Sequence, residues 1–114
     1  MITIYHNPKC RVSRAGLEHL KSKGVEFKVV EYLRDPFTGE QLKELLMKLN
    51  LNPHDLIRTQ EDIYKTRFRG KMFTNEEWIS ILLEYPKLMR RPVVARGYKA
   101  VVAIPADEMD RLFE

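Results

Sequence analysis

The first 32 residues decide the predicted fold of this chain; they read MITIYHNPKCRVSRAGLEHLKSKGVEFKVVEY. Residues 2–5 alternate weakly between apolar and polar side chains, which predicts a short strand. Residues 11–23 carry apolar side chains at helical spacing, and Gly24 follows them as a helix stop signal. Residues 27–32 are rich in β-branched and aromatic side chains, which predicts a second strand. Such a strand, helix and strand with short connections form a βαβ unit, whose two strands are parallel.

The rest of the chain predicts helices followed by a β-hairpin. The expected elements are a leucine-rich helix that Thr38 caps, short helices over 54–57 and within 61–71, a helix that begins at a capping box of Thr74 and Glu77, strands over 93–95 and 100–103, and a last helix over 106–113. This order predicts an α/β protein with a thioredoxin-like fold, a mixed four-stranded sheet and a helical insertion after the second strand. We expect a single domain over residues 1–114.

Composition excludes several classes of protein. The chain is 44% hydrophobic and 32% charged, as soluble globular proteins are, and no apolar run approaches the ~20 residues of a membrane span. The net charge of +4 is mild and no block of five like charges occurs, so nucleic-acid binding is not indicated, whereas an anionic small substrate fits. No export signal is recognised and the single cysteine cannot form an internal disulfide, so we expect a cytoplasmic protein.

Cys10 is the candidate nucleophile, because it lies where the first strand has ended and the helix begins. Unpaired N–H groups at a helix start favour a thiolate. Lys9, Arg11, Arg14 and His6 add positive charge nearby in the sequence. The alternative interpretation is a buried small hydrophobic residue, which is the usual role of a lone cysteine. The cationic neighbours favour the reactive thiol.

Ser13 completes a Cys-x-x-Ser motif with Cys10. Serine cannot resolve a mixed disulfide, so a disulfide cycle at Cys10 needs an external thiol. The Ser13 hydroxyl either donates a hydrogen bond to a thiolate or oxyanion, or caps the first turn of the helix. His6 either tunes the thiol or is a surface residue. His19 and His54 have no companion ligands at metal spacing, so no metal site is predicted.

The segment His6-Asn7-Pro8-Lys9-Cys10-Arg11-Val12-Ser13-Arg14 resembles the signature His-Asn-Pro-x-Cys-x-x-Ser-Arg of the glutaredoxin-linked arsenate reductase (ArsC) family. Two further segments resemble the family's arginine-bearing motifs: Leu56-Ile57-Arg58 and Arg90-Arg91-Pro92-Val93-Val94. Tyr32-Leu33 and Phe73-Thr74 also fit, so the resemblance extends over nearly the whole chain, within the wider group that includes the Spx and YffB branches.

The resemblance implies a role for each matching residue. Cys10 is the nucleophile, Arg58 and Arg91 bind the oxyanion, and Pro92 follows a cis peptide bond beside the thiol. His6, Ser13 and Arg14 support the site. The implied substrate is arsenate, with glutathione as co-substrate, glutaredoxin as electron donor and no tightly bound cofactor. Arginine suits this task because its planar guanidinium binds oxyanions through paired hydrogen bonds.

Ile104 departs from the family pattern. The reductases carry a third arginine immediately before the proline that precedes the last helix, which is Pro105 here. Loss of one charge-assisted contact costs about 1.5–3 kcal/mol, or roughly tenfold or more in anion affinity. Arg96 and Lys99, in the neighbouring hairpin, are the candidates to replace this cation.

The sequence leaves three other functions open. A glutathione-dependent thiol reductase of the YffB-like branch, acting on glutathione mixed disulfides, is favoured by Ile104. Spx-type regulators bind RNA polymerase and usually carry Cys-x-x-Cys, which Ser13 removes. A monothiol glutaredoxin with an iron–sulfur cluster would need Cys-Gly-Phe-Ser, and Arg11-Val12 does not match this motif.

Overall fold

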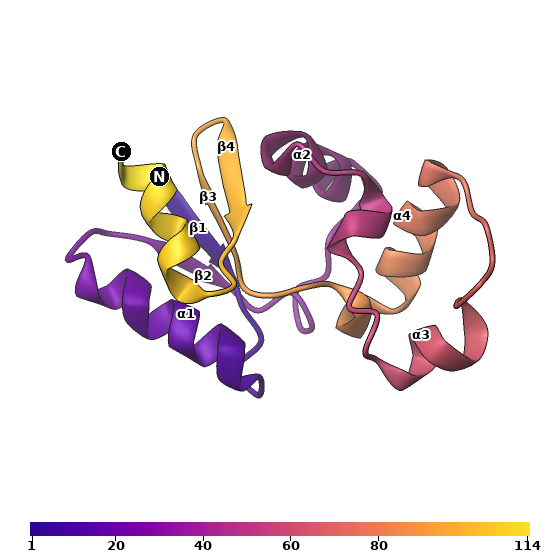
Figure 1. Ribbon diagram of the computed structural model, residues 1–114. Helices are drawn as coiled ribbons and strands as arrows, with labels where there is room; N and C mark the ends of the chain where they lie inside the picture. Colours follow the sequence, from indigo (N-terminus) through magenta and orange to yellow (C-terminus); the bar gives the residue numbers. More distant parts are fainter. The chain divides into compact units, whose positions relative to one another are not determined.

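Strand β1 (Ile2–Tyr5) lies inside a four-stranded sheet in the computed structural model, which describes residues 1–114 (Figure 1). On one side it pairs in parallel with β2 (Lys28–Val30), and on the other it pairs antiparallel with β3 (Val93–Arg96). Strand β4 (Lys99–Val102) pairs with β3 and completes the order β2-β1-β3-β4. The parallel βαβ unit, the hairpin and the mixed thioredoxin-like sheet are therefore confirmed.

Strand β2 is shorter than the predicted stretch of residues 27–32. Its ladder with β1 ends at the pair Tyr5–Val30, and the His6 N–H then donates to the Val30 carbonyl oxygen at 2.9 Å. Because β2 is an edge strand, it has no second neighbour to extend it once β1 has ended. Tyr32 therefore lies in the following turn, where its side chain is only 1% exposed.

Helix α1 (Arg11–Ser22) packs against the C-terminal 3₁₀ helix η3 (Ala106–Phe113), which also contacts β4 (Figure 1). Gly24, with φ of +68°, terminates the α1 segment as predicted. The two helices and the sheet share a hydrophobic core whose buried members are Ile2, Ile4, Leu20, Val94, Ala103, Met109 and Leu112. These elements belong to one compact unit, Met1–Asp35 with Arg91–Glu114.

Residues Pro36–Arg90 form a second compact unit, which is largely helical. Its elements are α2 (Gly39–Leu49), η1 (Pro53–Leu56), α3 (Asp62–Arg67), α4 (Asn75–Glu84) and η2 (Pro86–Leu88). Both predicted caps are present: the Thr38 hydroxyl accepts from the Gln41 N–H, and the Thr74 hydroxyl accepts from the Glu77 N–H, each at 3.1 Å. Helix α4 packs against α2, η1 and η2, and so holds this unit together.

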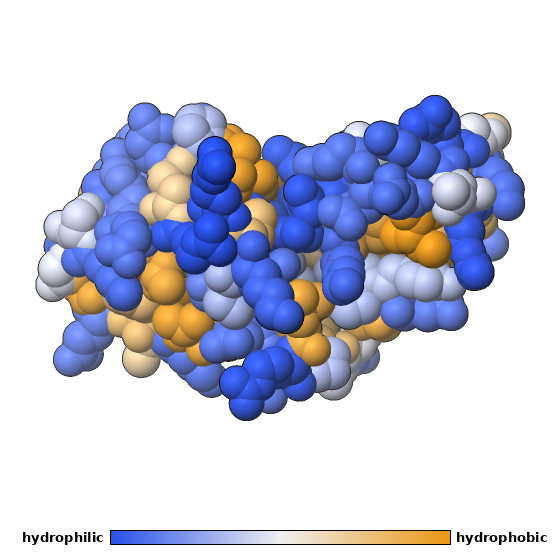
Figure 2. All heavy atoms as spheres, turned by 90° about the horizontal axis from the view of Figure 1, so that it is seen from below, coloured by the Kyte–Doolittle hydropathy of each residue, from blue (hydrophilic) through white to orange (hydrophobic).

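The surface seen in Figure 2 is mostly hydrophilic, with hydrophobic atoms in small separate areas. The large hydrophobic side chains that are exposed are scattered along the sequence: Met1, Val12, Val29, Met47, Met72, Tyr98 and Ile104. No helix has the length and apolar character needed to cross a membrane.

Gly16 is a close-approach position on the buried side of α1. A β-carbon built on Gly16 would lie 2.4 Å from Cγ of Pro92, which is far inside van der Waals contact. Pro92 is itself fully buried, so its ring has little room to move. The absence of a side chain at residue 16 therefore lets the helix pack directly on Pro92.

We expect Gly16→Ala to destabilise the protein by roughly 1–3 kcal/mol, because overpacking outweighs the ~1 kcal/mol gain in helix propensity. Urea unfolding measures the difference in the free energy of unfolding. Gly39→Ala is the matched control, since a β-carbon there makes only an ordinary contact with Leu83 at 3.8 Å. A Gly16→Ala protein as stable as the wild type would contradict this packing.

Candidate active site

Cys10 immediately precedes helix α1, and backbone hydrogen bonds on both sides hold it in place. Its backbone is extended, with φ of −95° and ψ of 125°. The Cys10 N–H donates to the Asn7 carbonyl oxygen at 3.1 Å, and the Cys10 carbonyl oxygen accepts from the Arg14 N–H at 2.9 Å. The half-buried thiol therefore lies at the helix start, where the first N–H groups lack partners within the helix.

The pKa of the Cys10 thiol lies below its usual value. Burial is the largest single effect and raises the pKa, because it disfavours the thiolate. The opposing effects together outweigh burial: the backbone N–H of Ser13, the hydrogen bond and positive charge of Arg91, and the backbone N–H of Val12. The helix start thus lowers the pKa through the N–H groups of its first turn, which also carry the partial positive charge of the helix end.

Arg91 is the cation that acts on the thiol, rather than the cations that flank Cys10 in the sequence. Its side chain is only 8% exposed, and its peptide bond to Pro92 is cis, as the resemblance implies. The Pro92 carbonyl oxygen accepts from the Ala103 N–H at 2.9 Å, which ties this segment to the end of β4. Arg14, by contrast, is exposed and donates from Nη1 to the Pro8 carbonyl oxygen at 3.0 Å.

His6 and Ser13 form a buried polar network with the loop before α1. His6 Nδ1 lies 2.7 Å from the Ser13 hydroxyl oxygen, which also accepts from the Asn7 N–H at 3.0 Å. Burial is the main cause that lowers the pKa of His6. The hydroxyl of Ser13 can therefore donate to a neutral imidazole. His6 is thus a buried residue, and the Ser13 side chain links the first turn of α1 to the loop.

Arg58 belongs to the unit Pro36–Arg90 and follows a short backbone ladder there. The Arg58 N–H donates to the Leu88 carbonyl oxygen at 2.7 Å, next to a bridge between Ile57 and Met89. Its guanidinium donates from Nη1 to the carboxylate of Glu61. No sequence motif assigns a role to Glu61, although its position three residues after Arg58 is compatible with an ion pair across a turn.

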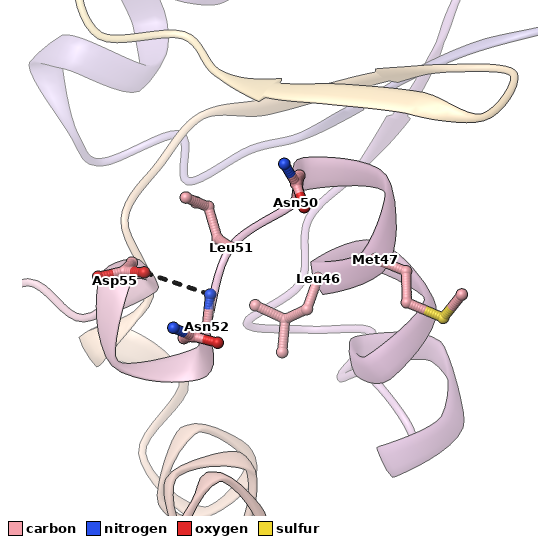
Figure 3. A pocket seen from close by; sticks show the side chains of 6 residues that line it. All are labelled: Leu46, Met47, Asn50, Leu51, Asn52 and Asp55. Atoms are coloured by element: carbon pink, nitrogen blue, oxygen red, sulfur yellow. Dashed lines mark hydrogen bonds between the residues drawn. The ribbon is translucent and has the colours of Figure 1, made fainter.

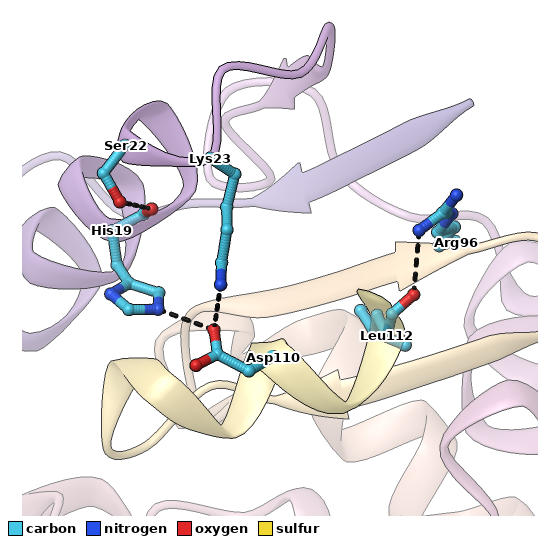
Figure 4. Close-up of polar contacts among 6 residues, drawn as sticks. All are labelled: His19, Ser22, Lys23, Arg96, Asp110 and Leu112. Atoms are coloured by element: carbon cyan, nitrogen blue, oxygen red, sulfur yellow. Dashed lines mark hydrogen bonds and ion pairs between the residues drawn. The ribbon is translucent and has the colours of Figure 1, made fainter. Parts of the chain in front are cut away.

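The structure does not bring Arg96 or Lys99 to Cys10. In the sheet, Arg96 pairs with Ile2 and Lys99, at the opposite end of β1 from Tyr5 and the Cys10 loop. Arg96 instead donates from Nη1 to the Leu112 carbonyl oxygen at 3.0 Å (Figure 4). Neither residue therefore replaces the cation that the family pattern has at Ile104. The strand register explains this, because only the opposite end of the sheet faces the thiol.

His19 has a structural partner in η3. Its Nε2 lies 2.7 Å from the Asp110 carboxylate, which also forms an ion pair with the Lys23 ammonium at 2.7 Å (Figure 4). Lys23 first and His19 second lower the pKa of Asp110. Lys23 also lies 5.3 Å from the centre of the Phe113 ring. These contacts fasten the C-terminal helix to α1.

A pocket of about 550 Å³ lies in the unit Pro36–Arg90 (Figure 3). It is lined by Leu46, Met47, Asn50, Leu51, Asn52 and Asp55. In Figure 3 the Asn52 N–H donates to the Asp55 carboxylate, at 3.2 Å. None of the predicted site residues lines this pocket. The chain also brings together no group of three or more His, Cys, Asp or Glu side chains that could hold a metal ion.

The fold and the site define a thioredoxin-like protein with one acidic cysteine at a helix start and a buried arginine beside it. The chain belongs to the ArsC family, whose model matches residues 5–112.

Related proteins agree with this assignment over nearly their whole length. The chain is 38% identical over 110 residues to the uncharacterized protein YfgD of Escherichia coli (strain K12). This alignment covers 95% of this chain and 92% of YfgD. It is 32% identical over 111 residues to an arsenate reductase of Neisseria meningitidis serogroup A, with 96% and 95% covered. The solved arsenate reductase from Vibrio cholerae superposes with a TM-score of 0.91 at 32% identity, with 96% and 95% covered.

We expect Arg91→Gln to raise the pKa of Cys10, because burial then acts on the thiol without the opposing charge and hydrogen bond. The rate of alkylation by iodoacetamide as a function of pH measures this shift. Arg91→Lys should raise the pKa less, since it retains a charge. Arg111→Gln, on the exposed face of η3, is the charge-matched control. Equal titration curves for wild type and Arg91→Gln would contradict the interaction.

We expect His6 to make the folded protein less stable as the pH falls below about 6.5. The pKa of His6 is lowered in the folded state, so the unfolded chain takes up the proton first and unfolding is favoured. Urea unfolding at pH 7.5 and 5.5 measures this loss. The loss should be smaller in His6→Gln, which cannot titrate. An equal loss in both proteins would assign the acid sensitivity to other groups.

Proposed function

We propose that this protein is a thiol-dependent oxidoreductase that reduces arsenate, with glutathione as co-substrate and glutaredoxin as electron donor. The observation that carries the proposal is the Cys10 thiol beside Arg91 at the start of α1, with its pKa lowered. The named arsenate reductases of Neisseria meningitidis and Vibrio cholerae support the same activity. The lone cysteine and the glutathione requirement suit the cytosol, which is the compartment we propose.

The proposed reaction begins with attack of the Cys10 thiolate on arsenic. A sulfur–arsenic bond forms, and one arsenate oxygen leaves as water after taking up two protons. Glutathione then attacks the Cys10 sulfur. As the new disulfide forms, the electron pair of the sulfur–arsenic bond passes to arsenic, which leaves as arsenite. A glutaredoxin thiol finally attacks the glutathione sulfur of the mixed disulfide and releases Cys10 as a thiolate, so no tightly bound cofactor is needed.

The residues around the thiol fit this scheme. Arg91 stabilises the thiolate before attack, and its guanidinium suits the oxyanion that replaces that charge. Arg58 is the second oxyanion ligand in the proposal, on the strength of the Leu-Ile-Arg motif. The hydrogen bonds of Ser13 with His6 and of the Ala103 N–H with the Pro92 carbonyl oxygen hold the chain around the sulfur in place. Preorganised charge of this kind favours the reaction because no group must reorient during attack.

A second candidate function is reduction of glutathione mixed disulfides, as in the YffB-like branch. Ile104 favours it, because this residue is apolar, 39% exposed and located where the reductase pattern has an arginine. Neither Arg96 nor Lys99 supplies the missing charge, since both lie at the other end of the sheet. In this candidate, Cys10 attacks the disulfide directly and no oxyanion is bound.

The test is arsenate-dependent oxidation of NADPH in the presence of glutathione, glutaredoxin and glutathione reductase. We expect turnover in the wild type, none in Cys10→Ser, and a loss of roughly tenfold or more in kcat/KM for Arg91→Gln.

The same assay separates the two candidates when arsenate is replaced by a glutathione mixed disulfide of a small thiol. Arsenate turnover no higher than in Cys10→Ser, together with Cys10-dependent reduction of the mixed disulfide, would replace the first candidate with the second. Equal rates on both substrates in wild type and Cys10→Ser would contradict both.

A further inference from the structure

Arg58 has a fixed backbone and a paired side chain. Its N–H donates to the Leu88 carbonyl oxygen, and its carbonyl oxygen accepts from the Glu61 N–H at 3.2 Å, so residues 58–61 form a tight turn. The same turn brings the Glu61 carboxylate to the Arg58 guanidinium. The position of this arginine is therefore set by contacts within its own unit.

The Arg58–Glu61 ion pair is partly withdrawn from water. The two side chains are 21% and 27% exposed, whereas most other ion pairs in the chain include a side chain exposed by half or more. Partial burial reduces screening by salt and strengthens the interaction. The contact uses only Nη1 of the guanidinium and one carboxylate oxygen, Oε2. A guanidinium has five N–H donors, so this pairing leaves the group able to bind a second anion.

Glu61 has no other structural task that requires its charge. It is the residue before α3, yet its side chain makes no capping hydrogen bond to that helix. Helix α3 has only six residues and carries Asp62 in its first turn, which already supplies a negative charge there. The carboxylate of Glu61 therefore acts on Arg58 rather than on the helix.

We propose that Glu61 is a specificity-determining residue, whose carboxylate offsets the charge of Arg58 and weakens the binding of doubly charged inorganic oxyanions. This inference rests on the proposed function, in which Arg58 binds the oxyanion. An anion bound by Arg58 is repelled by the resident carboxylate, and a dianion is repelled more than a monoanion. Glu61 therefore lowers the net positive charge that Arg58 presents to an anion.

The test compares wild type, Glu61→Gln, Arg58→Gln and the double variant. Glutamine keeps a hydrogen-bond acceptor for Arg58 but removes the charge. We expect Glu61→Gln to lower the KM for arsenate and the inhibition constant of phosphate by roughly three- to tenfold, with kcat within about twofold. The gain should disappear in the Arg58→Gln background, because the two residues act as a pair. A role for Glu61 in folding alone would not produce this split between KM and kcat.

Asp62→Asn is the matched control, because it removes a neighbouring exposed carboxylate that is not paired with Arg58. It should change neither constant by more than about twofold. Thermal unfolding verifies that each variant is folded, and Glu61→Ala provides a second removal of the charge.

Protection of Cys10 from iodoacetamide by phosphate measures anion affinity without turnover. If Arg58→Gln weakens protection while Glu61→Gln does not strengthen it, the inference is wrong and the proposed function stands. If arsenate is not reduced but Glu61→Gln strengthens protection through Arg58, the inference stands and the proposed function is wrong. Absence of protection and of turnover in the wild type and in Glu61→Gln overturns both.

Discussion

The contact between the Cys10 sulfur and the Arg91 guanidinium depends on the register of the sheet. Tyr5, the last residue of β1, pairs with Val93, the first residue of β3. Because the two strands are antiparallel, the chain leaves β1 at the same end of the sheet where it enters β3. The loop that carries Cys10 and the segment that carries Arg91 and Pro92 therefore meet. A shift of register would separate the thiol from its cation and reverse the side-chain faces.

The pKa of the Cys10 thiol is set by a balance between burial and charge. Burial opposes the thiolate, and Arg91 with the first turn of α1 reverses its effect. The same burial keeps the nearby imidazole of His6 neutral to lower pH. Gly16 and Pro92 set how closely α1 approaches this region. The packing at this end of the sheet thus affects two titratable groups in opposite ways. The charged thiolate of Cys10 is favoured, and so is the uncharged imidazole of His6.

Local signals in the sequence are sufficient for the order of elements, the helix cap at Thr38, the capping box at Thr74 and the hairpin. They also located Cys10 at a helix start, and the resemblance supplied Arg91 and the cis bond. Side-chain direction was not accessible in this way: Arg96 is close to Arg91 in sequence, but strand register places it at the other end of the sheet. The contact of Gly16 with Pro92 joins residues far apart in the sequence, so no local pattern predicts it. The spacing of Arg58 and Glu61 is compatible with an ion pair, but the turn over residues 58–61 is needed to bring the two side chains together.

The long separation in sequence between Cys10 and Arg91 also has a consequence for synthesis on the ribosome. The βαβ part, with the thiol and its helix, emerges first, whereas the central strand β1 obtains its second neighbour only when β3 has been made. Until then Cys10 lacks the guanidinium that favours its ionisation. The lowered pKa of the thiol therefore develops together with completion of the sheet.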